Sequence, residues 1–385
     1  MPVFLAAVII LIAAFGNYIP TSAAEILYGL SLAIKSIIIF LLPAVIFCLL
    51  FNSTVNLAGD ASKIIILIFV SVIFSNFIST TVGQLIGIMI HNQDLSITMP
   101  EENNVLQGKI LFSMPSVIAN HYAMFSGIII GIIIANINPS FSRKLTEIFE
   151  IIINKLLKFI TALIPLFITG FIVKMKFDGI INQLFKDYSL IFFIIALSQI
   201  SYVSVLYFVV EKFNFSRTIH SIKNMIPAAL SGFSTMSSAA SMPLTIAAVS
   251  KNAANKNLVQ TLVPATVNIH LIGDCIAIPC FAFAILKNFG LGIPEFYTCL
   301  IFTFFFVIAK FSVAAVPGGG IIVMLPILEQ YLGFNTEMLS LITALYILFD
   351  PVITCCNVLG NGAFAKIIDK IVSLTLSLKQ NAVRT

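Results

Sequence analysis

Apolar runs long enough to cross a lipid bilayer recur along the sequence, and they restrict the possible folds more than any other feature. A transmembrane helix needs about 20 mostly apolar residues. The first six runs near this length cover residues 3–19, 36–55, 63–91, 122–137, 148–172 and 188–210. Of all residues, 59% are hydrophobic and 10% are charged, which lies outside the composition of soluble domains. The sequence therefore predicts an all-α, polytopic membrane protein.

The C-terminal half follows a different pattern. Residues 224–249 are rich in Ser, Ala, Thr and Gly, which is too polar for a lipid-facing span and too apolar for a loop. Residues 258–286 have the length of a full span, although His270 and Asp274 lie inside it. Residues 297–332 are interrupted by Val-Pro-Gly-Gly-Gly. Because non-helical backbone inside a membrane must be satisfied by protein or a water-filled cavity, we interpret the two unusual stretches as re-entrant hairpins.

The last apolar run, residues 339–370, carries a line of polar side chains. Its members are spaced by four, three and four residues, which places them on one narrow face of a helix: Asp350, Thr354, Asn357 and Asn361. A carboxylate at membrane depth costs about 3 kcal/mol, so it faces protein or a cavity and marks a candidate functional site. A polar seam that joins two helices is the alternative interpretation.

Basic residues between the runs indicate the orientation of the chain. The loops near Arg143, Arg217 and Lys251 and the C-terminal tail are expected on the cytoplasmic side, with the acidic residues 94–102 outside. Both termini are then cytoplasmic. No Lys or Arg precedes the first run, so we expect a retained helix rather than a cleaved signal peptide.

The remaining composition excludes some partners. The net charge of +5 does not indicate a nucleic-acid partner, because the basic residues lie in these loops. The six cysteines occur in apolar context without metal-site spacing, so we expect apolar core residues rather than disulfides. The Ile- and Phe-rich usage is typical of an AT-rich bacterial genome, which favours the cytoplasmic (inner) membrane of a bacterium.

Several of these segments resemble the dicarboxylate/amino acid:cation symporters, the family of the glutamate transporter homologues. The resemblance covers the whole topology and is specific from residue 223 to residue 370. Five segments carry it: Ser237-Ser238, Met242-Pro243-Leu244-Thr245, Thr266-Val267-Asn268, Val316-Pro317-Gly318-Gly319-Gly320, and the last run with Asp350, Thr354, Asn357 and Gly360.

The resemblance implies a glutamate-transporter-like elevator fold with eight transmembrane helices and two re-entrant helical hairpins. Residues 1–62 (helices 1 and 2) and 117–175 (helices 4 and 5) would form a scaffold. Residues 63–92 (helix 3) and 188–375 would form a mobile transport domain. The second of these segments divides into helix 6, hairpin 1 (about 224–249), helix 7 (about 258–286), hairpin 2 (about 297–332) and helix 8 (about 339–370).

The resemblance also implies the activity. The chain would be a homotrimeric secondary active transporter, not an enzyme. It would carry an amino acid or a dicarboxylate together with sodium and/or protons, without a cofactor.

Site residues follow from the same resemblance. The substrate-binding residues would be Ser237, Ser238, Pro317, Gly318, Gly319, Asp350, Thr354 and Asn357. Asp350 would hold a substrate ammonium, and Thr354 and Asn357 the carboxylate end. Cation sites would use the backbone near Thr266 and Asn268, with a possible sodium ion at Asn268, Asn357 and Asn361.

The sequence departs from the family where carboxylates bind cations. His270 and Asn361 stand at positions where the family has acids, and each missing carboxylate weakens a sodium site. His270 is a candidate proton carrier because imidazole titrates near neutral pH, with Asp274 one turn further on as its expected partner. A buried neutral histidine is the alternative. Ile353 replaces the arginine that reads an acidic side chain, so we expect a neutral or small zwitterionic amino acid as substrate.

Two other functions are compatible with these residues. A homologue without the cation carboxylates would act as an uncoupled channel or a substrate sensor. An intramembrane aspartyl protease, with Asp274 and Asp350 as paired acids, is the more remote alternative. Accumulation of an amino acid against its gradient would distinguish a symporter from both.

Overall fold

The computed structural model describes residues 7–8, 11–12, 14–59, 63–92, 106–110, 112, 114, 118, 120–177, 181–313 and 318–384. This part of the chain is helical and has no strand, which confirms the all-α prediction. Its elements are η1 (Gly16–Tyr18), α2 (Thr21–Gly59), α3 (Lys63–Asn92), α4 (Asn120–Ile137), α5 (Pro139–Phe177), α6 (Ile181–Val210), α7 (Phe215–Thr235), α8 (Ser238–Asn252), α9 (Lys256–Thr266), α10 (Ile272–Asn288), α11 (Phe296–Lys310), α12 (Gly319–Leu332) and α13 (Thr336–Arg384). The expected first span lies partly outside the described residues, and residues 94–102 lie entirely outside them.

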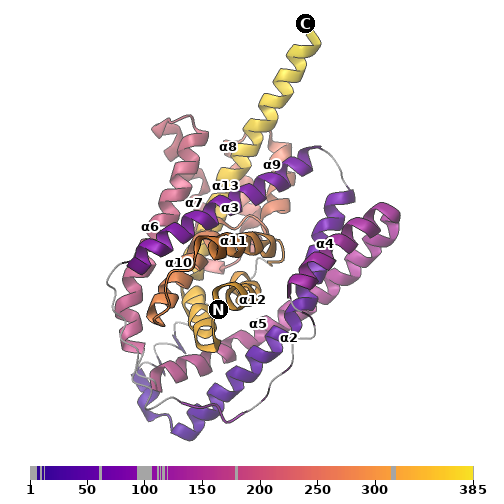
Figure 1. The fold of residues 1–385 in the computed structure, drawn as a ribbon. Coiled ribbons are helices and arrows are strands. Elements are labelled where there is room, and N and C mark those ends of the chain that lie inside the picture. Colours follow the sequence, from indigo (N-terminus) through magenta and orange to yellow (C-terminus); the bar gives the residue numbers. More distant parts are fainter. Residues whose placement is uncertain are drawn as a thin grey trace.

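Helices α2, α4 and α5 pack against one another and form one side of the molecule (Figure 1). Aromatic rings fill the contact between α2 and α5. Phe149 of α5 lies edge-on to Phe47 and Phe51 of α2, with ring centroids 5.9 and 5.0 Å away. Such pairs stabilise a contact beyond the apolar area they bury.

Helix α10 lies at the centre of a second group of helices, with α3, α6, α12 and α13 around it. It packs between α3 and α13, and Lys287 is its one residue that is not fully buried. A helix that is apolar on all sides is expected in such a central position. Side-chain amides from two neighbouring helices cross-link the group. Gln84 Nε2–H of α3 donates to the Cys299 carbonyl at 3.1 Å, and Gln199 Nε2–H of α6 donates to the Gly273 carbonyl at 2.9 Å.

The two stretches interpreted as hairpins are each a pair of short helices. Met236 separates α7 from α8 with a left-handed φ of 51°. Ser237 then caps α8, since its Oγ accepts the Ala240 N–H at 3.1 Å. In the second pair, Gly318 directly precedes α12 with a φ of 73°, which is the conformation that favours glycine.

The stretch expected as a single helix over residues 258–286 is instead divided into α9 and α10 by a turn at residues 267–271. A buried turn leaves backbone carbonyls without helical partners. Asn76 of α3 satisfies one of them, because its Nδ2–H donates to the Ile269 carbonyl at 2.7 Å. The apolar pattern did not reveal this break, since the partner comes from a distant helix.

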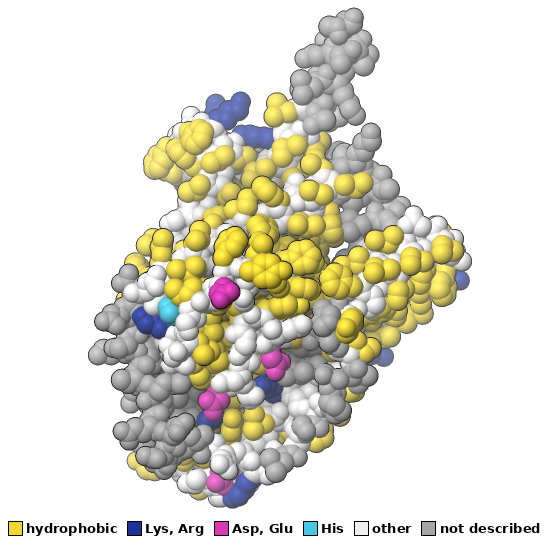
Figure 2. Space-filling view, in the orientation of Figure 1, with side chains coloured by type: hydrophobic (Ala, Val, Ile, Leu, Met, Phe, Trp, Pro, Cys, Tyr) yellow, Lys and Arg dark blue, Asp and Glu magenta, His cyan; other side chains and the backbone are white. Residues whose placement is uncertain are grey.

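Three helices of the described chain are long and apolar enough to cross a membrane: Ile66–Asn92, Tyr188–Val210 and Thr336–Leu374. Large apolar side chains remain on their surfaces, and Phe74 and Met89 of α3 are each 66% exposed. Figure 2 shows hydrophobic side chains in a broad band across the face drawn, with Lys and Arg mainly above and below it. The six cysteines are free, and five of them are buried, as expected for apolar core residues.

A buried polar cluster joins the loop after α6 to α7 and α13. The Lys366 ammonium of α13 donates to the Glu211 carboxylate and, at 2.9 Å, to Ser221 Oγ of α7. One turn further on, Asp369 accepts the backbone N–H groups of Ala254 and Asn255 at 2.7 and 3.0 Å. The cluster therefore anchors both ends of the α7–α8 pair to α13.

Replacing Lys366 with methionine is expected to destabilise the protein by about 3 kcal/mol at neutral pH, because Glu211 would stay buried without its counter-charge. Burial by itself would raise the pKa of Glu211, but its bonds from Lys366 and Ser221 hold that pKa below its ordinary value. The pair therefore stabilises the fold above about pH 4, the ordinary pKa of a glutamate, and loses this effect as the pH falls through the lowered pKa. Thermal unfolding of the wild type and of Lys366→Met at pH 7 and at a pH well below 4 measures both effects.

The double variant Glu211→Gln/Lys366→Met is the matched control, since it removes both charges and keeps similar volumes. It should regain most of the stability lost at pH 7. A Lys366→Met variant as stable as the wild type would show that the cluster does not anchor these helices.

Candidate functional site

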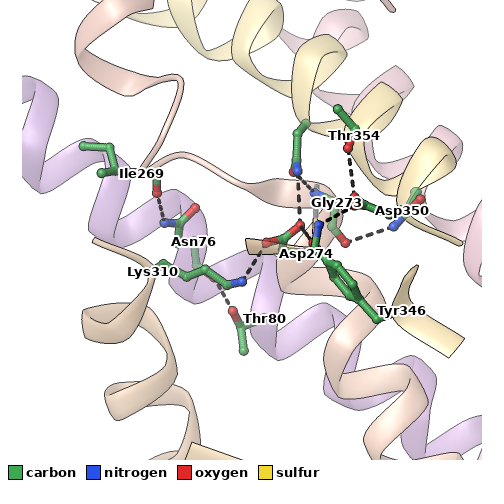
Figure 3. Close-up of polar contacts among 12 residues, drawn as sticks. Asn76, Thr80, Ile269, Gly273, Asp274, Lys310, Tyr346, Asp350 and Thr354 are labelled. Atoms are coloured by element: carbon green, nitrogen blue, oxygen red, sulfur yellow. Dashed lines mark hydrogen bonds and ion pairs between the residues drawn. The ribbon is translucent and has the colours of Figure 1, made fainter. Parts of the chain in front are cut away.

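Polar side chains from α11 and α13 converge on Asp274 of α10 (Figure 3). The face of α13 predicted from its spacing is buried: Asp350, Thr354, Asn357 and Asn361 are each less than 5% exposed. Tyr346 precedes Asp350 by one turn on the same helix, and it is also buried. The structure thus gathers the predicted line of polar residues into the interior.

Asp350 faces the beginning of α12. Its Oδ2 accepts the Gly318 N–H at 2.9 Å, and its Oδ1 accepts the Thr354 hydroxyl at 3.0 Å. A helix N-terminus carries free N–H groups and a partial positive charge, both of which favour a carboxylate. Because an ionised carboxylate has about four acceptor positions, Asp350 can accept further donors.

Asp274 in the first turn of α10 is the second carboxylate of the site. Its Oδ2 forms a 2.8 Å ion pair with the Lys310 ammonium at the end of α11. Its Oδ1 accepts the Tyr346 hydroxyl and the Asn357 Nδ2–H, each at 3.1 Å. All four side chains are less than 5% exposed, so these bonds form away from water and are stronger for it.

Asn357 links α13 to α10 through both ends of its amide. Its Nδ2–H donates to Asp274, and its Oδ1 accepts the Gly273 N–H at 2.8 Å. The α10 backbone approaches α13 closely at Gly273, where a Cβ would lie 2.3 Å from the Ile353 carbonyl oxygen. Asn357 therefore fixes the position of Asp274 relative to α13.

His270 lies in the turn between α9 and α10, in a second polar cluster. Its Nε2 is 2.8 Å from Ser75 Oγ of α3, and its ring lies against Phe364 with centroids 4.2 Å apart. Asn361 Nδ2–H donates to the His270 carbonyl at 3.3 Å. Three buried polar atoms in this cluster have no hydrogen-bond partner among the described residues: His270 Nδ1, Asn361 Oδ1 and Asn76 Oδ1.

The expected pairing of His270 with Asp274 is wrong. A spacing of four residues brings side chains together only within one helix. Here α10 begins at Ile272, so His270 belongs to the preceding turn, while Asp274 bonds to Lys310.

The other predicted site residues lie in different parts of the structure, and not all of them lie beside Asp350. Gly318 and Gly319 lie at the start of α12, beside Asp350, and Pro317 lies outside the described residues. Ser237 and buried Ser238 begin α8, on a helix pair that packs against α13. Thr266 is buried and its hydroxyl donates to the Leu262 carbonyl within α9.

One of the three residues of the possible sodium site differs from the other two in its exposure. The Asn268 side chain is exposed, whereas Asn357 and Asn361 are buried. Among the described residues, no three His, Cys, Asp or Glu side chains are grouped closely enough to hold a metal ion. Any cation here would depend on amide, hydroxyl and backbone oxygens in addition to single carboxylates.

Sequence reasoning assigned no role to four residues of this region: Asn76, Gln199, Lys310 and Tyr346. Two signals were available. Lys310 ends the strongly apolar run of α11 without a neighbouring acid, and a lysine at such a position needs a buried partner. Tyr346 lies four residues before Asp350, on the face already identified.

Apolar helices that enclose a charged site beside two broken helix pairs define a class, that of multi-pass membrane transport proteins. The model of the sodium:dicarboxylate symporter family matches residues 2–371, and the chain belongs to this family. The resemblance drawn from the sequence motifs is therefore confirmed.

The curated proteins that the chain matches are distant relatives. Excitatory amino acid transporter 1 of Mus musculus is 24% identical over 252 residues, which cover 63% of this chain and 45% of that protein. The Homo sapiens protein of the same name is 23% identical over the same coverage. Excitatory amino acid transporter 3 of Homo sapiens is 28% identical over 180 residues, or 46% of this chain and 33% of that protein. The chain thus spans less than half the length of the relatives it matches.

Proposed function

We propose that the protein is a secondary active transporter that carries an amino acid or a dicarboxylate by cation-coupled symport. The observation that supports this most is the placement of Asp350. A buried carboxylate lies on a long apolar helix, against the start of α12 and beside a second, fully paired acid. Such a carboxylate is suited to bind the ammonium group of a substrate.

The charges of the site favour a neutral or small zwitterionic amino acid. Lys310 is already paired with Asp274, and Ile353 offers no positive charge where an acidic side chain would lie. A second substrate carboxylate would be buried without a counter-charge, which is unfavourable. The single α-carboxylate of an amino acid is better matched to the N–H groups at the start of α8, near Ser237 and Ser238, and to the second Nδ2–H of Asn357. Thr354 would join them by turning its hydroxyl from Asp350 to the substrate.

The transport cycle that fits this family is an elevator motion. The group α2, α4 and α5 would form the scaffold of a homotrimer, and the helices around α10 would carry the substrate across the cytoplasmic membrane of a bacterium. The α11–α12 pair, with Gly318 and Gly319 at the start of α12, would act as the outer gate. Both termini would be cytoplasmic.

Sodium, protons or both would supply the coupling. The unpartnered polar atoms His270 Nδ1 and Asn361 Oδ1 offer a place for a proton or a weakly held cation. An uncoupled channel or a sensor remains the second candidate, because carboxylates are absent at these two positions. The family does not favour a protease, and Asp274 and Asp350 are each hydrogen-bonded to separate donors.

Uptake into proteoliposomes tests the proposal. Purified protein is reconstituted with a panel of labelled neutral amino acids, acidic amino acids and dicarboxylates, under an imposed sodium gradient, an imposed proton gradient or neither. We expect at least one neutral amino acid to accumulate above its external concentration when a gradient is imposed. Equilibration that no gradient changes would identify a channel or facilitator and overturn the symport assignment.

Replacing Asn361 with aspartate is expected to strengthen the sodium dependence of uptake, because it adds a carboxylate where hard cations favour negative oxygen ligands. The sodium concentration for half-maximal uptake should fall several-fold in Asn361→Asp. Asn361→Ala removes the oxygen without adding charge and serves as the control. If the aspartate and alanine variants respond to sodium alike, this position does not contribute to a cation site.

A further inference from the structure

Lys310 brings a positive charge into the centre of the candidate site. Its side chain is 0% exposed, and its Nζ lies 2.8 Å from Asp274 Oδ2. The same Nζ lies 4.8 Å from the centroid of the Phe306 ring, whose face attracts a cation. An ammonium at this depth must be paired, so the position of Lys310 is specified by Asp274.

Asp274 is held by three donors, and Lys310 is the one among them that carries a charge. The other two are the Tyr346 hydroxyl and the Asn357 amide. With Asp350 nearby, the site holds two carboxylates and one ammonium. Without Lys310 it would hold two close carboxylates, an arrangement that strongly attracts a cation or a proton.

The pair also lies where the broken α11–α12 pair closes over α10. Lys310 is the last residue of α11, and Gly320 lies in the first turn of α12. A Cβ on Gly320 would lie 2.3 Å from both Asp274 Oδ2 and Tyr346 Oη. Both helices therefore converge on the Asp274 carboxylate, and in Figure 3 Lys310 and Asp350 lie on opposite sides of it.

Carboxylate oxygens are ligands that suit a hard cation. At Asp274 Oδ2 the Lys310 ammonium already holds this position with its own single charge. We propose that Lys310 is the resident counter-cation of Asp274, and that it takes the place of a free monovalent cation at this position. Lys310 is then the residue that determines the coupling-ion requirement here, a role that rests on the proposed transport function.

Truncation of Lys310 at its Cβ provides a direct test. Lys310→Ala removes the atoms Cγ to Nζ, which together correspond to an n-propylammonium ion. The variant therefore keeps the Asp274 carboxylate and opens space beside it. Free Na⁺ or n-propylammonium is expected to enter this space and stabilise the variant.

The measurement is thermal unfolding of the purified full-length protein without substrate, in chloride salts of Na⁺, n-propylammonium or choline at equal ionic strength. Choline is too large for the vacated space. A site with a Kd of about 10 mM, filled from about 100 mM cation, raises the folded-to-unfolded ratio about tenfold. We expect this gain for Lys310→Ala in Na⁺ or n-propylammonium relative to choline, and a smaller response in the wild type.

Two matched variants separate charge from packing. Lys310→Met fills the same volume without charge and leaves no room, so it should not respond to cations. Asp274→Asn/Lys310→Ala leaves room without negative charge and should not respond either. Lys310→Ser, which is as short as the alanine variant, tests the same expectation should the alanine variant not fold.

The proposal is overturned if Lys310→Ala and Lys310→Ser respond to Na⁺ and n-propylammonium no more than the wild type does. It is also overturned if neither variant folds in any of the salts while Asp274→Asn/Lys310→Met does, since the pair is then purely structural. Because no substrate is present, the outcome is independent of uptake. If cations selectively stabilise Lys310→Ala but no substrate of the panel is taken up, the proposed function is rejected. The assignment of Lys310 as the resident counter-cation of Asp274 then still stands.

Discussion

Asp350→Ala is expected to abolish substrate uptake. Asp350 is the carboxylate of the site that can still accept donors, whereas the Asp274 carboxylate is occupied by Lys310, Tyr346 and Asn357. Loss of a charge-assisted bond to a substrate ammonium costs about 3 kcal/mol, which corresponds to a more than hundredfold loss of affinity. Labelled uptake into proteoliposomes, with substrate binding measured in detergent, gives the two readouts.

Asp350→Asn is the matched variant, since its amide oxygen can still accept the Gly318 N–H and keep α12 in place. It should fold like the wild type and still fail to bind substrate, because it lacks the charge. Normal uptake by Asp350→Ala would show that Asp350 does not bind the substrate ammonium, and the site assignment would then be wrong. Normal uptake by Asp350→Asn alone would show that Asp350 acts as a structural acceptor for α12.

Gly273→Ala is expected to destabilise the fold strongly. Its Cβ would lie 2.3 Å from the Ile353 carbonyl oxygen and 3.0 Å from Asn357 Oδ1. The nearest atom belongs to the backbone of a buried helix, so side-chain rotation cannot relieve the contact. Separating α10 from α13 would also lengthen the Gly273–Asn357 bond that positions Asp274. Overpacking of this kind costs about 3 kcal/mol.

The thermal midpoint and the yield of monodisperse protein measure this effect. Gly292→Ala is the control, because a Cβ there has no atom within 4 Å and the residue lies in the exposed connection between α10 and α11. It should behave like the wild type. Equal midpoints for Gly273→Ala and Gly292→Ala would contradict the close packing of α10 on α13.

Features that depend on neighbouring residues could be predicted well. The apolar run expected at residues 63–91 is α3 (Lys63–Asn92), and the run at residues 122–137 is α4 (Asn120–Ile137). The polar face of the last helix was predicted for the same reason. Residues three and four apart on a helix share a face whatever lies opposite, so Asp350, Thr354 and Asn357 could be grouped without a structure.

The partners of that face could not be predicted, because they come from distant parts of the chain. Lys310 is 36 residues from Asp274, and Asn357 is 84 residues from Gly273. The break between α9 and α10 depends on Asn76, which is 193 residues from Ile269. Without these contacts, a helix that continued through His270 was the simpler expectation, and it led to the wrong partner for Asp274.

The sequence alone therefore determined the class of fold, the broken helix pairs and one wall of the site, since these follow from hydrophobic length and helical periodicity. Its motifs also indicated the family that the chain belongs to. The tertiary structure alone decided which charges meet. It paired Asp274 with Lys310 and left Asp350 facing the start of α12. A buried charge is stable only beside its counter-charge or hydrogen-bond donors, and it is the packing of α10, α11 and α13 that brings these groups together.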